Sequence, residues 1–180
     1  MTTQTKTLWK IDPSHSEIQF KARHLVISTV TGSFNSFDAR VETDDDTFEG
    51  ADIFFEADVD SVNTNNEDRD THLKSDDFFN AEKFPKLTFA SNSLEKVGEN
   101  AYKLTGDLTI RDVTKPVTLD VVHGGTVEDP YGQVKAGFEV NGTINRKEFG
   151  LKWNGITEAG NLVVGDEIQL LLNVQFVQQD

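Results

Sequence analysis

The sequence contains no cysteine, and it has only one methionine and four prolines among its 180 residues. The absence of cysteine excludes disulfides and thiolate metal sites. No stretch approaches the roughly 18 consecutive apolar residues that a membrane-spanning helix needs. Between Val41 and Asp68 the chain carries many acids but no lysine or arginine, and the net charge is -14. Such a surface repels phosphate groups, so the composition argues against nucleic-acid binding and predicts a solvated acidic face.

The first ten residues, MTTQTKTLWK, lack the apolar core of a secretion signal. The sequence as given therefore predicts a cytoplasmic protein, and a periplasmic one if a leader has been removed.

Alternation of apolar and polar residues dominates the rest of the chain. In the stretch 17–24, Ile18, Phe20, Ala22 and His24 share one face of a predicted strand, and charged or polar residues share the other. Similar alternation predicts strands at 7–12, 32–43, 51–60, 86–94, 102–110, 117–121, 134–140 and 168–176. The pattern slips between Phe34 and Phe37, which predicts a bulge. We expect a loop or bend at 25–30, a break at 113–116 and an irregular stretch at 145–165.

These eight or nine strands with short turns are typical of an antiparallel meander. Closing a meander into a barrel removes its exposed edges, and eight strands leave an interior that holds side chains or one slender ligand. We therefore predict an all-β, closed, eight-stranded antiparallel barrel, and a two-sheet sandwich is the alternative. No repeat or linker divides the chain, so residues 1–180 are expected to form one domain.

One long stretch, 61–85, does not alternate. Asn63 or Thr64 is expected to cap a first short helix, and Ser75 a second. The apolar residues of the stretch would then cover the mouth of the barrel as a lid: Leu73, Phe78, Phe79 and Phe84.

Catalytic motifs are weak. His15-Ser16-Glu17 lacks the cysteine pair of zinc deaminases, and 44–50 lacks the ligand spacing of a calcium loop. Asp68, Asp70 and His72 could form a metal-assisted hydrolase site, but a solvated helix face is the simpler interpretation. The sequence has no nucleophile elbow, P-loop or dinucleotide fingerprint. We expect no enzyme activity, no cofactor and no metal.

Five blocks of the sequence resemble the YceI-like family. They are WKIDPSHS at 9–16 with Phe20, Arg23 and His24; RDTHLKS at 69–75 with 77–79 and 84–85; GDLTI at 106–110 with VTKPV at 113–117; Asn145-Arg146 with Phe149-Gly150; and VGDE at 164–167. The resemblance implies a lipocalin-like barrel that binds a long apolar chain, such as a polyisoprenoid, an isoprenoid quinone or a fatty amide. It implies no catalytic set, and it allows a homodimer.

The leading hypothesis is thus a protein that sequesters or carries such a chain inside the barrel. The alternative is a structural or stress-related interaction module with a solid core. The expected ligand contacts are Phe20, His24, Phe34, Ile53, Phe55, Leu73, Phe78, Phe89, Leu104, Leu108, Phe138, Arg146 and Leu170. His24, Arg146 and His72 are expected at the rim, where they would hold the ligand's headgroup.

Overall fold

The computed structural model describes residues 6–25, 27–44, 47–153 and 164–179. Within these ranges the strands form one 11-stranded sheet in which every pairing is antiparallel. The strands are β1 (Lys6–Ile11), β2 (Glu17–His24), β3 (Ser28–Phe34), β4 (Phe37–Asp44), β5 (Asp52–Asp58), β6 (Val62–Asn63), β7 (Lys86–Lys96), β8 (Ala101–Ile110), β9 (Val113–Glu128), β10 (Val134–Asn145) and β11 (Val164–Gln178). Helix α1 spans Glu67–Lys74, and the short 3-10 helices η1, η2 and η3 span Pro13–His15, Val59–Ser61 and Arg146–Phe149.

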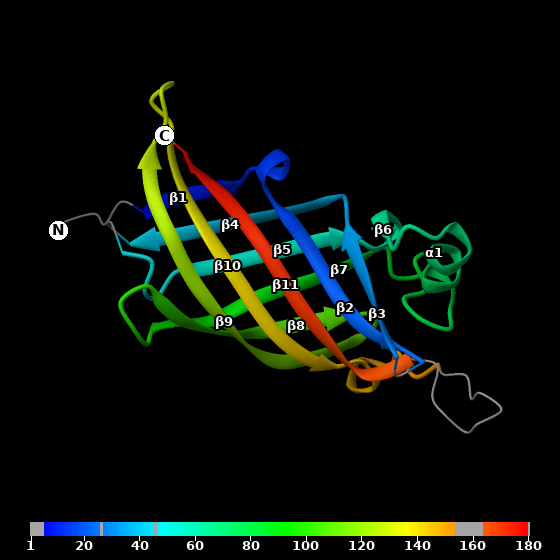
Figure 1. The fold of residues 1–180 in the computed structure, drawn as a ribbon. Coiled ribbons are helices and arrows are strands. Elements are labelled where there is room, and N and C mark those ends of the chain that lie inside the picture. The colour runs from blue at the N-terminus through cyan, green and yellow to red at the C-terminus, as the bar shows by residue number, and fades with distance from the viewer. Residues whose placement is uncertain (1–5, 26, 45–46, 154–163, 180) are drawn as a thin grey trace.

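The sheet closes into a barrel (Figure 1). Its ring runs β1-β4-β5-β7-β8-β9-β10-β11, and β11 pairs back with β1, with Trp9 opposite Gln178 and Ile11 opposite Phe176. The prediction of a closed eight-stranded antiparallel barrel is confirmed, and the sandwich alternative is wrong.

At two positions in the ring, one strand replaces another part-way along the length of the barrel. After η1, β2 takes the place of β1 beside β11, with Phe20 opposite Leu170, and β3 pairs with β2. Asn35 and Ser36 then separate β3 from β4, which continues beside β1. The slip between Phe34 and Phe37 is therefore a bend between two strands and not a bulge within one strand.

Two predicted interruptions were misplaced. The stretch 25–30 was expected to be a loop, but β3 already begins at Ser28, after a turn in which Leu25 has a φ of 54°. The break expected at 113–116 is the start of β9, and the turn lies just before it, where Arg111 has a φ of 57°. Proline is tolerated at position 116 because β9 pairs there only with β8, and its pairing with β10 begins at Asp120.

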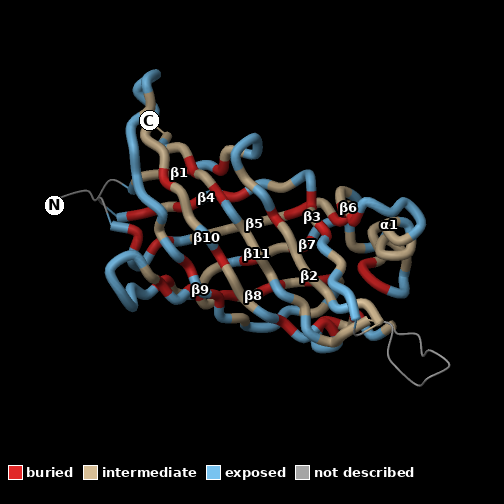
Figure 2. The backbone as a smooth tube through the Cα atoms, in the orientation of Figure 1, coloured by how far each residue is buried: buried red, intermediate tan, exposed pale blue. Residues whose placement is uncertain are grey.

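The core lies inside the barrel. Buried residues alternate with less buried ones along the strands (Figure 2); in β8, Leu104, Gly106, Leu108 and Ile110 are buried and the residues between them are partly buried. Gly106 of β8 leaves room for a neighbouring ring: a Cβ there would collide with the Phe89 ring and lie 2.6 Å from the Ala90 carbonyl oxygen. The close approach expected at this glycine is thus present.

The stretch expected to hold two helices contains one in the described residues. Asn66 caps α1, because its side-chain oxygen accepts a hydrogen bond from the Arg69 N–H at 3.0 Å. Ser75 ends this helix instead of starting a second one. Thr64 is buried, and its hydroxyl donates to Asp70 Oδ1 at 2.6 Å and accepts from Arg69 Nε at 2.7 Å. These polar bonds hold a helix that has almost no apolar face of its own.

A candidate ligand-binding cavity

An elongated apolar cavity of about 230 Å³ lies inside the barrel. Apart from Gln19 and Arg146, every residue that lines it is apolar, and the lining comes from the strands all round the ring and from the segment that follows α1. The interior of an eight-stranded barrel is just wide enough for side chains or for one thin hydrocarbon chain. The described lining therefore favours contact with apolar surface.

The structure brings nearly all the predicted ligand contacts together at this cavity. The predicted residues that line it are Phe20, Phe34, Ile53, Phe55, Leu73, Phe78, Phe89, Leu104, Leu108, Phe138, Arg146 and Leu170. Those on strands share the inward side, as period-two alternation requires, whereas Leu73, Phe78 and Arg146 come from α1, the segment after it and η3. Phe84, which was expected to face the mouth, is not among the lining residues, and its ring instead lies under the Arg111 guanidinium at 5.7 Å.

His24 is the exception among the predicted contacts. It continues the inward face of Ile18, Phe20 and Ala22, but it ends β2 beyond the cavity and does not line it. It lies opposite Ser28 and Val164 in the sheet. Alternation gives the face of a residue and not how far the cavity extends along the strand.

Arg146 lines the cavity but is not a free rim cation. It is 2% exposed, and its guanidinium donates to four backbone carbonyls: those of Gly165 (2.8 Å), Leu151 (2.6 Å), Trp153 (2.7 Å) and Val164 (3.2 Å). Burial lowers the pKa of this guanidinium, and the nearby Asp166 carboxylate, 3.9 Å from Nη2, opposes that shift. The side chain therefore fastens the chain after η3 to the start of β11.

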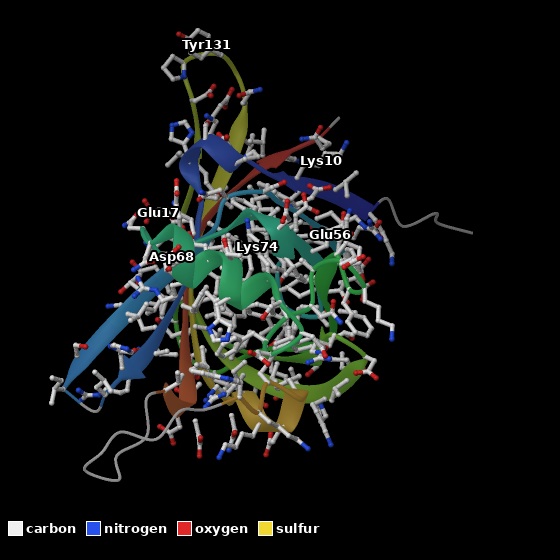
Figure 3. All side chains as sticks on the ribbon, turned by 90° about the vertical axis from the view of Figure 1, so that its right-hand side faces the viewer. Lys10, Glu17, Glu56, Asp68, Lys74 and Tyr131 are labelled. Atoms are coloured by element: carbon white, nitrogen blue, oxygen red, sulfur yellow. The ribbon has the colours of Figure 1, made fainter. Side chains whose placement is uncertain are left out.

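Helix α1 and the segment after it lie across one end of the barrel, seen face-on in Figure 3, where Asp68 and Lys74 mark the helix. Leu73, Phe78 and Phe79 line the cavity from this side. Arg111, in the β8–β9 turn, holds the segment down: its guanidinium donates to the carbonyls of Asp76 (3.0 Å) and Phe78 (3.1 Å) and to the Asp76 carboxylate (2.8 Å). We call residues 64–84 the lid.

Asp70 and His72, two of the three polar residues considered for a metal site, are bonded to the protein. Asp70 bonds Thr64, and His72 Nε2 lies 2.9 Å from Asp77 Oδ2. The His72 ring packs edge-on against Trp153 and Phe78, with centroids 4.6 Å and 5.1 Å away. Among the described residues no group of three or more metal-ligating side chains converges, at the lid or elsewhere.

At the other end of the barrel, where β4 ends and β5 begins (at the left in Figure 1), Phe48 lines the cavity, and the sequence analysis did not predict this role. Phe48 lies between β4 and β5, is 7% exposed, and packs against Trp9, His123 and Phe138 with centroids 5.3, 5.2 and 5.0 Å away. Its neighbours in the chain are Thr47 and Glu49, and it belongs to no alternating stretch, so no periodicity marks it. The only available signal was a lone phenylalanine in a turn.

A profile of the YceI-like domain matches residues 9–176. The chain belongs to the YceI-like family. A UPF0312 protein of Staphylococcus aureus strain USA300 is 37% identical to this YceI-like chain over 171 residues, which cover 94% of this chain and 97% of that protein. The resemblance noted in the sequence is thus confirmed along nearly its whole length.

Solved structures agree with the barrel. The Campylobacter jejuni YCEI protein superposes with a TM-score of 0.76 at 36% identity, over 88% of this chain and 90% of its own. A polyisoprenoid binding domain from Saccharophagus degradans, implicated in plant cell wall breakdown, superposes with a TM-score of 0.68 at 15% identity, over 95% of this chain and 98% of its own. The second likeness concerns the fold. In the described part of this YceI-like chain, none of the helices combines the length and the apolarity that a bilayer crossing requires.

Proposed function

We propose that this protein binds one long apolar chain, of the polyisoprenoid, isoprenoid-quinone or fatty-amide type, inside its barrel and thereby carries or sequesters it. The observation that supports this most is the continuous, almost wholly apolar cavity of about 230 Å³. A solid-cored interaction module would have no such cavity. The fold shared with a polyisoprenoid binding domain agrees with this proposal.

Binding of this kind depends on chain length. Each methylene removed from water contributes about 0.8 kcal/mol. A fifteen-carbon chain would thus gain roughly 12 kcal/mol, against an association cost of at least about 4 kcal/mol. The net of roughly 8 kcal/mol corresponds to micromolar affinity. Each added isoprene unit should lower the dissociation constant until the cavity is full.

The lid provides the route by which a ligand enters and leaves. Its helix is held by polar bonds at Thr64, and the segment after the helix is held by the Arg111 contacts, with no broad apolar face on the helix. Polar bonds near a surface can exchange for bonds to water at small cost. Opening the lid would uncover Leu73, Phe78 and Phe79, which line the cavity.

The test is to fill the cavity. Ala39 of β4 is 5% exposed and lines the cavity, and Ala90 of β7 is exposed on the outer surface. Ala39→Phe should abolish the rise in melting temperature that added prenyl quinone causes, while leaving the ligand-free protein folded. Ala90→Phe adds the same ring outside the barrel and should retain that rise. If Ala39→Phe is folded and still binds prenyl quinone as the unsubstituted protein does, the ligand does not lie in the barrel.

A further inference from the structure

A second cavity, of about 490 Å³, lies at the end of the barrel opposite the lid. Its walls come from the start of β1, the ends of β4, β7 and β11, the β7–β8 turn and β9. In contrast to the apolar cavity, its lining adds hydroxyl, amide, ring-nitrogen and charged groups to apolar side chains such as Phe48 and Val134. The polar residues that carry the argument are Thr43, Asn100, Tyr102, His123 and Gln178. We call it the polar cavity.

The two cavities meet at Phe48. Among the residues that the structure describes, Phe48 alone lines both cavities. The ring is held by edge contacts to His123 and Phe138, at interplanar angles of 66° and 83°, and by a tilted contact to Trp9. A rotation of this one ring would join the apolar cavity to the polar cavity. That change in polarity matches a molecule with a long apolar chain and a polar head.

Among the described residues that line the polar cavity, two carry charged side chains, Lys96 and Glu99, one of each sign. Burial lowers the pKa of His123, so that its ring, stacked on Phe138 with centroids 4.9 Å apart, is neutral near neutral pH. The whole chain has a net charge of -14, which repels anions. An anionic head would lose its water and find one ammonium group beside a carboxylate, and burying an incompletely paired charge is costly.

Hydrogen-bonding capacity is available there. Tyr102 is 7% exposed as a residue, but its hydroxyl oxygen stays accessible and makes no hydrogen bond to any of the residues that the structure describes. Thr43 Oγ1 has only long contacts, 3.4 Å to Trp9 Nε1 and 3.5 Å to the Thr7 carbonyl. At the lid, by contrast, Arg146 and His72 are bonded to the protein itself.

We infer that the polar cavity receives the uncharged, hydrogen-bonding head of the ligand (a quinone ring, a primary amide or a hydroxyl) while its chain lies in the apolar cavity past the Phe48 ring. This inference rests on the proposed function and adds to it the orientation of the ligand and the class of its head. The chain would then point toward the lid and the head away from it.

The two tryptophans of the sequence make the orientation measurable. Trp9 lines the polar cavity, and Trp153 packs at the lid against His72 and Phe78. A quinone quenches tryptophan fluorescence at short range. The fluorescence of two variants is therefore recorded while a short-chain prenyl quinone is added. The Trp153→Phe variant keeps Trp9, and the Trp9→Phe variant keeps Trp153. The melting temperature is measured in parallel.

Quenching should be several-fold greater for Trp9 than for Trp153. Equal or greater quenching of Trp153, or a rise in melting temperature without quenching of Trp9, overturns the inference and leaves the proposed function standing. No quenching and no rise in melting temperature in the unsubstituted protein overturns both.

The class of the head is tested by two further comparisons. A prenyl alcohol should bind on the order of tenfold or more tighter than the diphosphate of the same chain, because an incompletely paired charge costs over 1.4 kcal/mol to bury.

Tyr102→Phe should weaken binding of the alcohol about fivefold, the effect of losing one hydrogen bond of about 1 kcal/mol. Tyr131→Phe, at the exposed tip of the β9–β10 hairpin (Figure 3), is the matched control and should have no effect. Equal binding of the diphosphate, or equal effects of the two tyrosine variants, contradicts the assignment.

Discussion

Replacing Arg146 with methionine should destabilise the protein even when no ligand is present. The substitution keeps an unbranched chain inside the barrel wall but removes the donors to the carbonyls of Gly165, Leu151, Trp153 and Val164. A buried acceptor left without a partner costs about 1–3 kcal/mol. The Leu151 carbonyl lies in the buried part of this network, and the freed carbonyls nearer the surface can bond to water.

The expected loss in the free energy of unfolding is therefore about 1–3 kcal/mol, the cost of leaving the buried Leu151 carbonyl without a hydrogen-bond donor. This is a large share of the roughly 5–15 kcal/mol by which domains are stable. The assay is chemical denaturation of protein from which lipid has been extracted. The control is Lys147→Met, because the neighbouring ammonium is 44% exposed and contacts Asp166 at 3.3 Å. Such a surface pair contributes about 0–1 kcal/mol.

The result decides between two roles for this arginine. If Arg146→Met leaves unfolding unchanged but weakens binding of an anionic amphiphile, Arg146 is a ligand-binding cation and the structural role derived from its hydrogen bonds is wrong. Arg146→Lys should recover only part of the stability. The planar guanidinium spreads its donors toward four carbonyls, and a single ammonium group cannot donate to all four.

Three further predictions concern packing, the lid and pH. Gly106→Ala should destabilise by about 1–3 kcal/mol through collision with Phe89, whereas Gly137→Ala, with no atom within 4 Å of the new Cβ, should change stability by less than about 0.5 kcal/mol in denaturation. Arg111→Ala releases the contacts to the lid and should speed ligand exchange in stopped-flow measurements; an unchanged rate would show that the lid is not the gate. His123 has a lowered pKa when folded, so the unfolded chain binds the extra proton and stability is lost as the pH falls below about 6.5 toward the folded pKa. His123→Gln should reduce that loss in melting temperatures from about pH 7 to about pH 5, and an unchanged pH profile would contradict the role of burial.

The parts of this protein that follow a regular period were predictable from sequence. Ile18, Phe20 and Ala22 line the cavity because every second residue of a strand faces the same way. The same rule placed Leu104, Leu108 and Leu170 correctly on the inner wall. It failed for His24 because periodicity gives a face but does not show where along the strand the cavity ends.

Other features depend on contacts between distant segments. Phe48 closes the barrel from the connection between β4 and β5. Its ring packs against Trp9, His123 and Phe138, which are distant in sequence, so local periodicity could not predict its position. The role of Arg146 requires that carbonyls from two segments converge on it. The helix start was ambiguous for a local reason, since Asn63, Thr64 and Asn66 can all act as caps. Thr64 serves instead as a buried partner for Asp70.

The content of the barrel can be measured most directly by native mass spectrometry of the protein purified from the cells that make it. We predict a mass above that of the bare chain, matching one long apolar molecule that solvent extraction removes and that added prenyl quinone replaces. A bare chain before extraction, together with no uptake of prenyl quinone afterwards, would contradict the proposal that the barrel binds such a ligand.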